Sequence, residues 1–472
     1  MIDFIKNSKS DLIFSNFTCN VGSLIDRHQC FIDQSKREVA FVILPQHELA
    51  LKLYLLTMAS KLVPLFLHDK IAPKALMHLL DRFKPAKLIT SDQYKNAIPG
   101  YKMSCFGDGY VVLEARRVID YKIDDDLCLL VSTSGSTGSP KLIPQTFSNL
   151  ITNTEQIIRA LNISGDNVAI ASLPLSYTFG MSVVNSQLLK HGIILASNFN
   201  LCDKLTLQSI LEHNVTTLAG VPTHYEQLVQ FKFFESKYSQ SIRNFLQAGG
   251  RLKTNTYKTI RTHQIRRNFN FYRMYGQAEA TTRITTSSPE MPDIDCVGVG
   301  KPIKGIDLFI DEAVSSTTKL VCGGEICLRG ANVCPDYVFA FEDLAKLKER
   351  KHNILRTGDL GYIDDYGELF ITGRIKRFAK IRGISYNLDE IENYIFSETG
   401  IVTPCLESGD RVHVFYPLDE SSLAHQTLDD IFNEIDLLDR NFHFSVDIPL
   451  LSNGKVSYSE LEKKLILVGR YS

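Results

Sequence analysis

Residues 128–161 read CLLVSTSGSTGSPKLIPQTFSNLITNTEQIIRAL and join a β-rich run, a Gly/Ser/Thr-rich loop and a segment of helical period. The run CLLVSTS, rich in β-branched and apolar residues, predicts a strand. Apolar residues recur near one helical face from Leu150 to Leu161, which predicts a helix over 146–161. We therefore expect the loop to lead from a strand into a helix.

The same alternation of short β-rich runs and longer helical segments continues along the chain. Strands are predicted at NVAIASL, GIILAS, TTLAGV, NFLQAGG and NFYRMYG, and the earlier stretch VAFVILPQHELALKLYLLTMASKLVPLFL repeats the pattern. Such alternation is typical of parallel sheets covered by helices. We predict an α/β fold whose large N-terminal domain contains parallel-rich sheets covered by helices.

The length of 472 residues exceeds what one hydrophobic core normally holds, so at least two domains are expected. The string LGYIDDYGELFITGR predicts a hairpin around Asp365-Tyr366-Gly367. A boundary is predicted near Arg374. This divides the chain into a large domain, 1–374, and a smaller, mobile α+β domain, 375–472.

The composition gives no general reason to bind nucleic acid or anionic lipid, because 52 basic residues nearly balance 53 acidic ones. The N-terminus lacks a secretory pattern, and no apolar run approaches the roughly 20 residues of a membrane span. Cys322, Cys327 and Cys334 lack zinc-binding spacing. We expect a cytoplasmic protein with reduced thiols and no stable membrane insertion.

The loop TSGSTGSPK suits a polyphosphate. Its glycines let backbone N–H groups turn toward an anion, its hydroxyls add donors, and its lysine adds positive charge. The GK[ST] ending of a Walker motif is missing, which disfavours an ordinary P-loop NTPase. A flexible Ser/Gly loop is the alternative. The candidate phosphate-binding residues are Thr133, Ser134, Gly135, Ser136, Thr137, Gly138 and Lys141.

Further candidate binding residues follow predicted strands. They lie at the carboxyl edge, where open α/β sheets bind their ligands. Tyr275 offers an aromatic face for a flat base, and Gly249-Gly250 permits close backbone approach, so together they indicate an adenine slot. A core position is the alternative for Tyr275. Glu279 carries a carboxylate suited to hold Mg²⁺ beside a triphosphate. An ordinary surface glutamate is the alternative.

Eight further strings follow in order between Leu173 and Lys455: LPLSYTFG, GVPTHYEQL, AGG, MYGQAE, GEI, RTGDLGYID, GRIKRFAKIRG and LSNGK. Together with TSGSTGSPK they resemble the acyl-adenylate-forming superfamily of acyl-CoA synthetases, aryl-CoA ligases, luciferases and peptide-synthetase adenylation domains. The resemblance covers nearly the whole chain. It implies that ATP, with Mg²⁺, activates a carboxylic acid as its acyl-AMP, releasing pyrophosphate. The acyl group then passes to a thiol, with CoA as the preferred acceptor.

The resemblance also implies roles for residues of the large domain. Tyr275 and Gly276 fall in the segment that resembles the family's adenine-binding segment. Asp359 resembles the aspartate that accepts both ribose hydroxyls, and Arg374 resembles the arginine that contacts ribose and phosphate. A surface salt bridge is the alternative for Arg374.

Three residues of the small domain take their implied roles from the family as well. Lys455 resembles the lysine that bridges the attacking carboxylate and the α-phosphate when the small domain closes, and is the leading catalytic candidate together with Glu279. Lys376 would be the hinge for domain rotation, and Gly383 would leave room for a pantetheine arm.

Three positions differ from the residues most common in the family's motifs. Leu142 replaces a glycine, Ala278 replaces a threonine, and Lys376 stands where an aspartate often marks the hinge. The loss of the threonine hydroxyl removes a hydrogen bond to the AMP phosphate worth about 0.5–1.5 kcal/mol unless backbone groups replace it. Activity is therefore expected to be slower but retained.

The sequence says least about which acid is activated and which acceptor receives the acyl group. No acidic residue occurs in LPLSYTFGM to pair with a substrate ammonium, so a non-amino carboxylic acid is favoured. Tyr177 and Phe179 suit an acyl pocket and a plain core equally. A ligase that loads a separate carrier protein remains open, as does a non-catalytic nucleotide or acyl sensor. The joint presence of Glu279, Asp359 and Lys455 disfavours the sensor.

Overall fold

A computed structural model of the chain describes most of its length. The described residues are 5–15, 17–28, 36–45, 48–91, 98–107, 109–117, 120–132, 141–197, 200–290, 298–312, 323–350, 354–381, 384–408, 411–417, 428, 440–445, 448–451 and 456–468.

One sheet of the described chain has seven strands in the order β6-β7-β5-β3-β4-β8-β9. The pairs β3–β4, β3–β5 and β4–β8 are parallel, whereas β6, β7 and β9 pair antiparallel with their neighbours. Its strands are β3 (Glu38–Leu44), β4 (Leu62–His68), β5 (Lys87–Ser91), β6 (Tyr101–Gly107), β7 (Tyr110–Ala115), β8 (Leu127–Ser132) and β9 (Leu142–Thr146).

A second sheet has nine strands in the order β16-β15-β14-β13-β12-β10-β11-β1-β2. Its middle, from β14 to β1, is parallel throughout. Its strands are β1 (Asp11–Ile13), β2 (Thr18–Asn20), β10 (Val168–Ile170), β11 (Ile193–Leu195), β12 (Thr217–Gly220), β13 (Asn244–Gln247), β14 (Asn270–Tyr275), β15 (Thr285–Thr286) and β16 (Lys301–Pro302).

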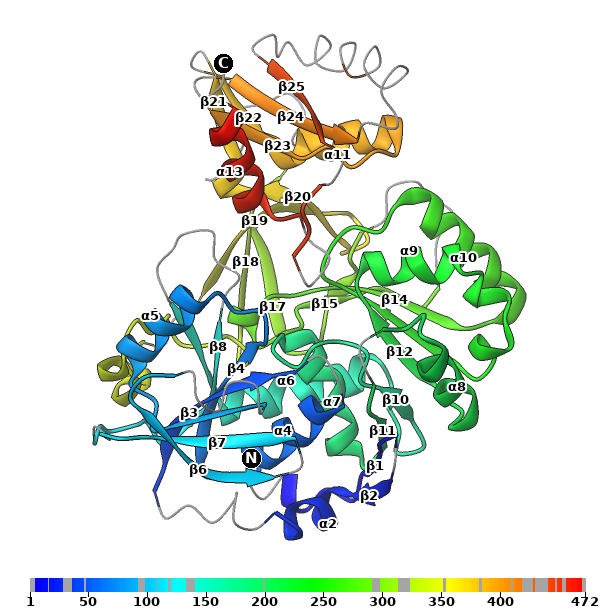
Figure 1. The fold of residues 1–472 in the computed structure, drawn as a ribbon. Coiled ribbons are helices and arrows are strands. Elements are labelled where there is room, and N and C mark those ends of the chain that lie inside the picture. Colours follow the sequence, from blue (N-terminus) through cyan, green and yellow to red (C-terminus); the bar gives the residue numbers. More distant parts are fainter. Residues whose placement is uncertain are drawn as a thin grey trace.

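Helices lie between these sheets and over their outer faces (Figure 1). Residues of α4, α6 and α7 join the buried clusters of the interior, whereas α5 packs outside the first sheet and α8, α9 and α10 outside the second. The helices are α2 (Val21–Asp26), α4 (Leu49–Met58), α5 (Pro73–Phe83), α6 (Phe147–Ala160), α7 (Thr178–Lys190), α8 (Lys204–Glu212), α9 (Pro222–Gln230) and α10 (Thr254–Arg267).

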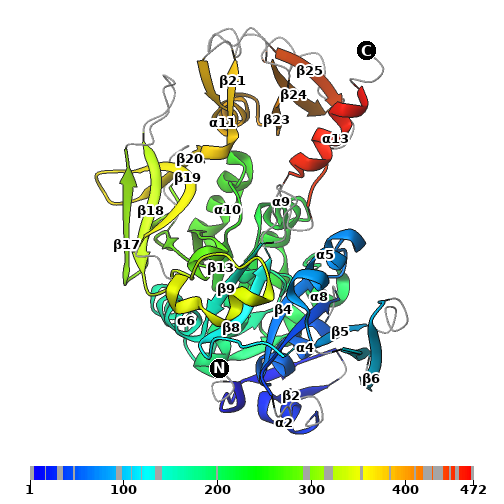
Figure 2. The same cartoon turned by 90° about the vertical axis from the view of Figure 1, so that its left-hand side faces the viewer.

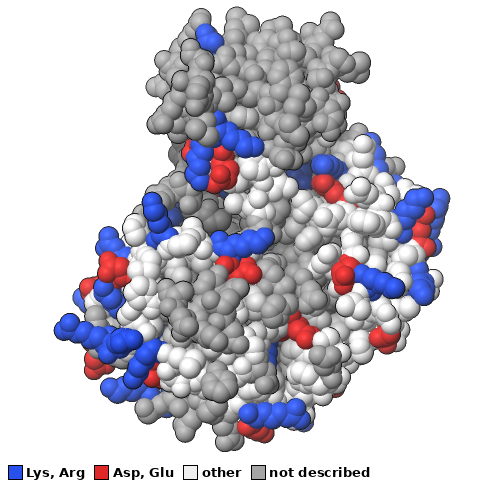
Figure 3. Space-filling model, in the orientation of Figure 1, with Lys and Arg blue, Asp and Glu red and all other residues white. Residues whose placement is uncertain are grey.

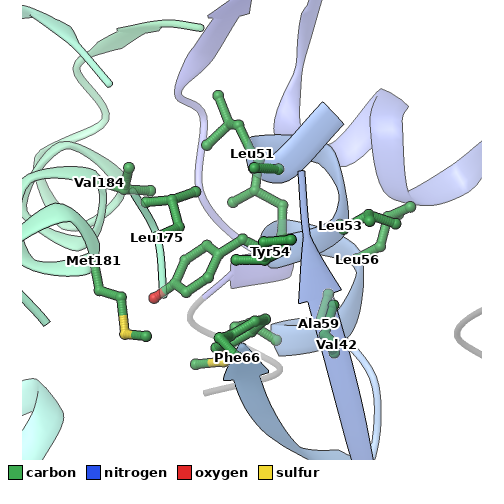
Figure 4. Packing of buried hydrophobic residues seen from close by; sticks show 14 of the residues in the cluster. Val42, Leu51, Leu53, Tyr54, Leu56, Ala59, Phe66, Leu175, Met181 and Val184 are labelled. Carbon is green, nitrogen blue, oxygen red and sulfur yellow. The ribbon is translucent and has the colours of Figure 1, made fainter. Parts of the chain in front are cut away.

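The sequence of α4, LALKLYLLTM, is apolar on almost every side, and all ten of its residues are buried. A helix without a polar face must be covered all round, and α4 accordingly lies in the interior. Figure 4 shows Tyr54 of α4 reaching toward Leu175 and Met181. Its hydroxyl donates to Asn185 Oδ1 at 2.8 Å, which satisfies the polar end of a buried ring.

A four-stranded sheet follows, in the order β17-β18-β19-β20. The predicted hairpin is confirmed, because β19 and β20 pair antiparallel and Gly367 adopts a φ of 80° in the turn between them. The backbone N–H of Glu368 donates to Asp364 Oδ1 at 2.7 Å and closes this turn. The strands are β17 (Ile306–Asp311), β18 (Gly324–Gly330), β19 (Leu355–Ile363) and β20 (Leu369–Arg374).

The remaining elements form a lobe with its own buried cluster, drawn from residues 379–428 (Figures 1 and 2). Its sheets have the orders β21-β22 and β23-β24-β25. The elements are β21 (Phe378–Ile381), β22 (Ile384–Asn387), α11 (Leu388–Thr399), β23 (Cys405–Ser408), β24 (Arg411–Pro417), β25 (Arg440–Ser445) and α13 (Tyr458–Val468).

Short 3-10 helices occur between the larger elements of the described chain. They are η2 (Phe233–Glu235), η3 (Lys237–Ser239), η4 (Ala278–Ala280), η5 (Phe341–Ala345), η6 (Leu347–Arg350) and η7 (Ile375–Arg377).

The surface and the helices add two observations. On the face in Figure 3, basic and acidic side chains lie interspersed, as the near-neutral composition leads one to expect. In the part of the chain that the structure describes, no helix is both long enough and apolar enough to cross a membrane.

The predicted fold class is confirmed, with one local correction. Residues 142–146, expected to lead into the helix, form β9 instead, which pairs antiparallel with β8. The Gly/Ser/Thr-rich loop therefore connects two strands, and α6 begins only at Phe147, where Thr146 and Asn149 form a capping box. The run LIPQT is too short to stand out from the helical pattern that follows it.

Candidate active site

Asp359 lies at the centre of the candidate site, where three elements meet. Its carboxylate accepts a hydrogen bond from the Tyr275 hydroxyl at 2.6 Å and another from Arg374 Nε at 2.9 Å, one on each oxygen. Tyr275 is the last residue of β14, while Asp359 and Arg374 face each other across the β19–β20 hairpin. The structure thus brings together three residues that the sequence marked separately.

Burial and charge tune this triad. Asp359 is 6% exposed and Tyr275 is 8% exposed, whereas the side chain of Arg374 is 60% exposed. Burial raises the pKa of Tyr275 well above its usual value, and the Asp359 carboxylate raises it further. The same carboxylate raises the pKa of Arg374, although burial acts in the opposite direction. The Asp359 carboxylate therefore lies between a phenol that keeps its proton and a guanidinium cation.

Glu279 lies in a second group with Lys141 and Tyr337. The Tyr337 hydroxyl donates to Glu279 Oε1 at 2.6 Å, and Lys141 Nζ lies 3.8 Å from the centre of the Tyr337 ring. Burial and the Glu279 carboxylate raise the pKa of Tyr337, so its hydroxyl keeps its proton and orients the carboxylate. No sequence signal pointed to Tyr337, because it lies 58 positions from Glu279 in a segment without a recognised motif.

The segment between Gly276 and Arg283 is folded tightly back on itself. A Cβ at Gly276 would stand 1.6 Å from the carbonyl oxygen of Thr282, so only glycine fits. Thr281 has a φ of 64°, and its hydroxyl donates to the Asn332 carbonyl at 2.6 Å. The Cys334 N–H donates to the carbonyl of Glu279 at 2.9 Å. The backbone that carries Glu279 is therefore fixed.

Gly249 and Gly250 follow β13, next to β14 in the parallel sheet. Both are exposed, Gly249 has a φ of 89°, and Gln247 Nε2 donates to the Gly250 carbonyl at 2.8 Å. They expose backbone beside the carboxyl end of β14, where Tyr275 lies. Such exposed backbone is expected of a surface that a flat ring approaches. The hydroxyl of Tyr275 itself points to the Asp359 carboxylate, to which it donates a hydrogen bond.

The candidate acyl residues lie at the beginning of α7. Tyr177 is the N-cap of this helix and Phe179 lies in its first turn, and both are partly buried. The Phe179 ring lies 4.8 Å from the guanidinium carbon of Arg283. A small cavity beside them is bordered by Thr178 and Thr282. The Thr282 hydroxyl donates to the Thr178 carbonyl at 3.2 Å.

The hinge candidate lies within the described chain, whereas eight other predicted site residues do not. Lys376 lies in η7, directly after β20. The predicted residues outside the described part of the chain are Thr133, Ser134, Gly135, Ser136, Thr137, Gly138, Gly383 and Lys455.

The donor set is compatible with a magnesium ion that arrives with a nucleotide. Mg²⁺ is commonly held by one or two carboxylates plus substrate phosphates. Glu279 supplies one partly buried carboxylate, oriented by Tyr337 and close to the lysine that ends the predicted phosphate loop. Among the described residues, three or more His, Cys, Asp or Glu side chains nowhere gather as a self-sufficient metal site would require. This arrangement fits an ion shared with phosphates.

Residues 35–338 match the family described as AMP-binding enzyme. This chain belongs to that family. The match covers well over half of the sequence and includes the phosphate loop, Tyr275 and Glu279. The resemblance predicted from the motifs is therefore confirmed.

Two known ligases are similar to this chain at moderate identity. A 2-succinylbenzoate–CoA ligase from Bacillus pumilus is 27% identical over 65% of this chain and 62% of its own length. A 4-coumarate–CoA ligase from Solanum tuberosum is 24% identical over 75% of this chain and 68% of its own length. The matched region thus spans less than two thirds of the 2-succinylbenzoate–CoA ligase.

Solved structures share the fold along almost the whole chain. The o-succinylbenzoate CoA synthetase from Bacillus subtilis, in complex with its acyl-adenylate intermediate, has a TM-score of 0.75 at 20% identity. That likeness covers 98% of this chain and 96% of the other. ATP-bound MatB from Rhodopseudomonas palustris has a TM-score of 0.77 at 20% identity, with 98% of each chain covered. The fold therefore includes both lobes.

Proposed function

We propose that this protein is an ATP-dependent, AMP-forming ligase that activates a non-amino carboxylic acid and passes the acyl group to a thiol, with CoA as the preferred acceptor. The observation that carries this proposal is the Asp359 carboxylate, buried between Tyr275 and Arg374 at 2.6 and 2.9 Å. A buried carboxylate with unused lone pairs suits the two hydroxyls of a ribose. We further propose that the protein is cytoplasmic.

In the first step, a carboxylate oxygen of the acid attacks the α-phosphorus of ATP. A P–O bond forms to the acid, the bond to pyrophosphate breaks, and acyl-AMP results. Asp359 and Arg374 hold the ribose, Gly249 and Gly250 border the base, and residues 133–141 bind the phosphates. Glu279 would hold the magnesium ion, which neutralises phosphate charge when bound. Lys455 would stabilise the charge that develops at the α-phosphate.

In the second step, the thiol sulfur attacks the acyl carbon, AMP leaves with the bridging oxygen, and the thiol proton is released. We propose that the domain of residues 375–472 rotates about Lys376 between the steps, carrying Lys455 away and bringing Gly383 to the thiol path. The separate buried cluster of residues 379–428 supports independent movement of this lobe.

The direct test is carboxylate-dependent ATP–pyrophosphate exchange against a panel of acids. The proposal predicts exchange with at least one non-amino acid, and none without magnesium. CoA and carrier proteins can then be compared as acceptors by thioester formation, because transfer to a carrier alone would favour the carrier-loading alternative. ATP binding without exchange for any acid in the panel would favour a nucleotide sensor instead.

A further inference from the structure

Arg283 is a buried cation without an acidic partner in the described structure. The residue is 3% exposed, and its Nε has no hydrogen-bond partner. No ion pair joins it to any carboxylate of the described chain, and burial is the cause that lowers its pKa, to about 9. The guanidinium is therefore still charged at neutral pH. Buried charges in proteins are normally paired, because an unpaired one is costly.

The surroundings of Arg283 do not supply the missing partner. Its guanidinium carbon lies 4.8 Å from the centre of the Phe179 ring, an attraction that orients the group but leaves Nε without a hydrogen-bond partner. The nearby hydroxyls of Ser182 and Ser186 donate to the carbonyls of Phe179 and Ser182, both at 2.7 Å. The side chain instead borders a cavity between α6, α7 and the second sheet, with Ile157, Leu161 and Leu246 as apolar walls.

This cavity adjoins the candidate acyl region. It shares Ile157 and Ser182 with the cavity that Thr178 and Thr282 border. The residue after Arg283, Ile284, donates its N–H to the carbonyl of Tyr275 at 2.9 Å, so Arg283 is tied directly to the strand end of the nucleotide site. Arg283 is buried, whereas Phe179 is only partly buried.

We propose that the acid substrate carries a second carboxylate, which pairs with the guanidinium of Arg283. This inference rests on the proposed ligase function. A carboxylate matches the planar fork of a guanidinium and supplies the missing counter-charge. The cavity beside Arg283 has a volume of about 10 Å³, room for about one water, so it must widen between α6 and α7 as the acid enters.

The test compares each dicarboxylic acid with its monoamide in ATP–pyrophosphate exchange. The two acids have nearly the same size and differ in the charge at the far end. Wild-type protein should show a kcat/KM about 10- to 100-fold higher for the dicarboxylate, the range expected for hydrogen bonds to a charged group. Arg283→Met, which keeps length without charge, should abolish the preference, and Arg283→Lys should retain part of it.

Binding provides a second readout that does not depend on turnover. The preferred dicarboxylate should raise the Tm of wild-type protein and leave that of Arg283→Met unchanged. Arg283→Met itself should be at least as stable as wild type, because it removes a buried unpaired charge. A strong loss of stability in both Arg283 variants would show that Arg283 is a structural residue and would overturn the inference.

The outcomes also separate this inference from the function on which it rests. If monoamides or simple monocarboxylic acids are activated as well as dicarboxylates, and Arg283→Met changes neither, the ligase function stands and the second-carboxylate inference is wrong. If no acid of either class supports exchange, the proposed function itself fails.

Discussion

Asp359 uses its two oxygens for two partners of different exposure. The Tyr275 hydroxyl is buried with it, whereas the Arg374 side chain is largely exposed. Each carboxylate oxygen can accept more than one hydrogen bond. Asp359 can therefore receive ribose hydroxyls while Tyr275 still orients it.

For this residue we predict that Asp359→Asn raises the KM for ATP about tenfold or more, since hydrogen bonds to a charged acceptor contribute about 1.5–3 kcal/mol. Tyr275→Phe is the matched control, because it removes the orienting hydroxyl and keeps the carboxylate. Its effect on the KM should be smaller. Steady-state kinetics at varied ATP measures both, and an unchanged KM in a folded Asp359→Asn variant would remove Asp359 from the nucleotide site.

Glu279 and Tyr337 allow a similar comparison for the metal. Glu279→Gln removes the negative charge at nearly constant shape, so the magnesium concentration for half-maximal exchange should rise strongly. Tyr337→Phe removes the 2.6 Å hydrogen bond that orients this carboxylate and should produce a smaller rise. Magnesium titrations of the exchange reaction measure both. Wild-type dependence in Glu279→Gln would show that another group holds the ion.

At the level of elements, the sequence predicted features that follow from local turns and periods. The hairpin predicted around residues 365–367 is present, and a register shift between Leu360 and Gly361 brings Asp359 opposite Arg374, a contact that the sequence did not predict. The alternation of strands and helices likewise indicated the parallel sheets. These features depend on periods and turns that lie within a few residues of one another.

Contacts between distant segments were not predictable in the same way. Tyr337 reaches Glu279 across 58 positions, and Arg283 reaches Phe179 across 104 positions. Neither pairing leaves a local pattern, because both depend on how the sheets and helices stack. The strand β9 was missed for a different reason, since five residues give too little alternation to separate a strand from an adjoining helix.

The tight return after β14 gives a prediction at this scale. Gly276→Ala should lower the free energy of unfolding by about 1–3 kcal/mol or more, because the new methyl group would meet backbone atoms of Thr282 that cannot rotate away. Gly367→Ala is the control, since that turn glycine has a positive φ but nothing within 4 Å of its added Cβ. Thermal unfolding should show the larger loss for Gly276→Ala, and equal losses would contradict the packing argument.

At the scale of the whole molecule, the C-terminal lobe ties its last helix to the connection with the large domain. Arg377, next to Lys376, donates to Asp389 Oδ1 at 2.9 Å and to Glu392 of α11. The hydroxyl of Tyr458, the first residue of α13, donates to Glu392 Oε2 at 2.6 Å. The helix α13, which follows Lys455 in the sequence, is therefore anchored beside the proposed hinge.

For the two-step mechanism we predict that Lys455→Ala slows acyl-AMP formation about 100- to 1000-fold, the range for one preorganised donor. Transfer from pre-made acyl-AMP should remain near the wild-type rate, because the rotated lobe has carried the lysine away. Lys463→Ala, which removes an exposed pair with Glu460 in α13, should change neither step. Equal losses in both half-reactions of Lys455→Ala would indicate a destabilised lobe instead.

The central claim is that the carboxylate of an acid attacks the α-phosphorus of ATP. The most direct measurement follows oxygen from a carboxyl-¹⁸O-labelled acid, chosen by the exchange panel, through complete turnover with CoA, a carrier protein or hydroxylamine as acceptor. The mechanism predicts one labelled oxygen in AMP, because the acyl C–O bond breaks in the second step and the bridging oxygen stays on phosphorus. Label in inorganic phosphate, or unlabelled AMP formed together with the acyl product, would contradict it.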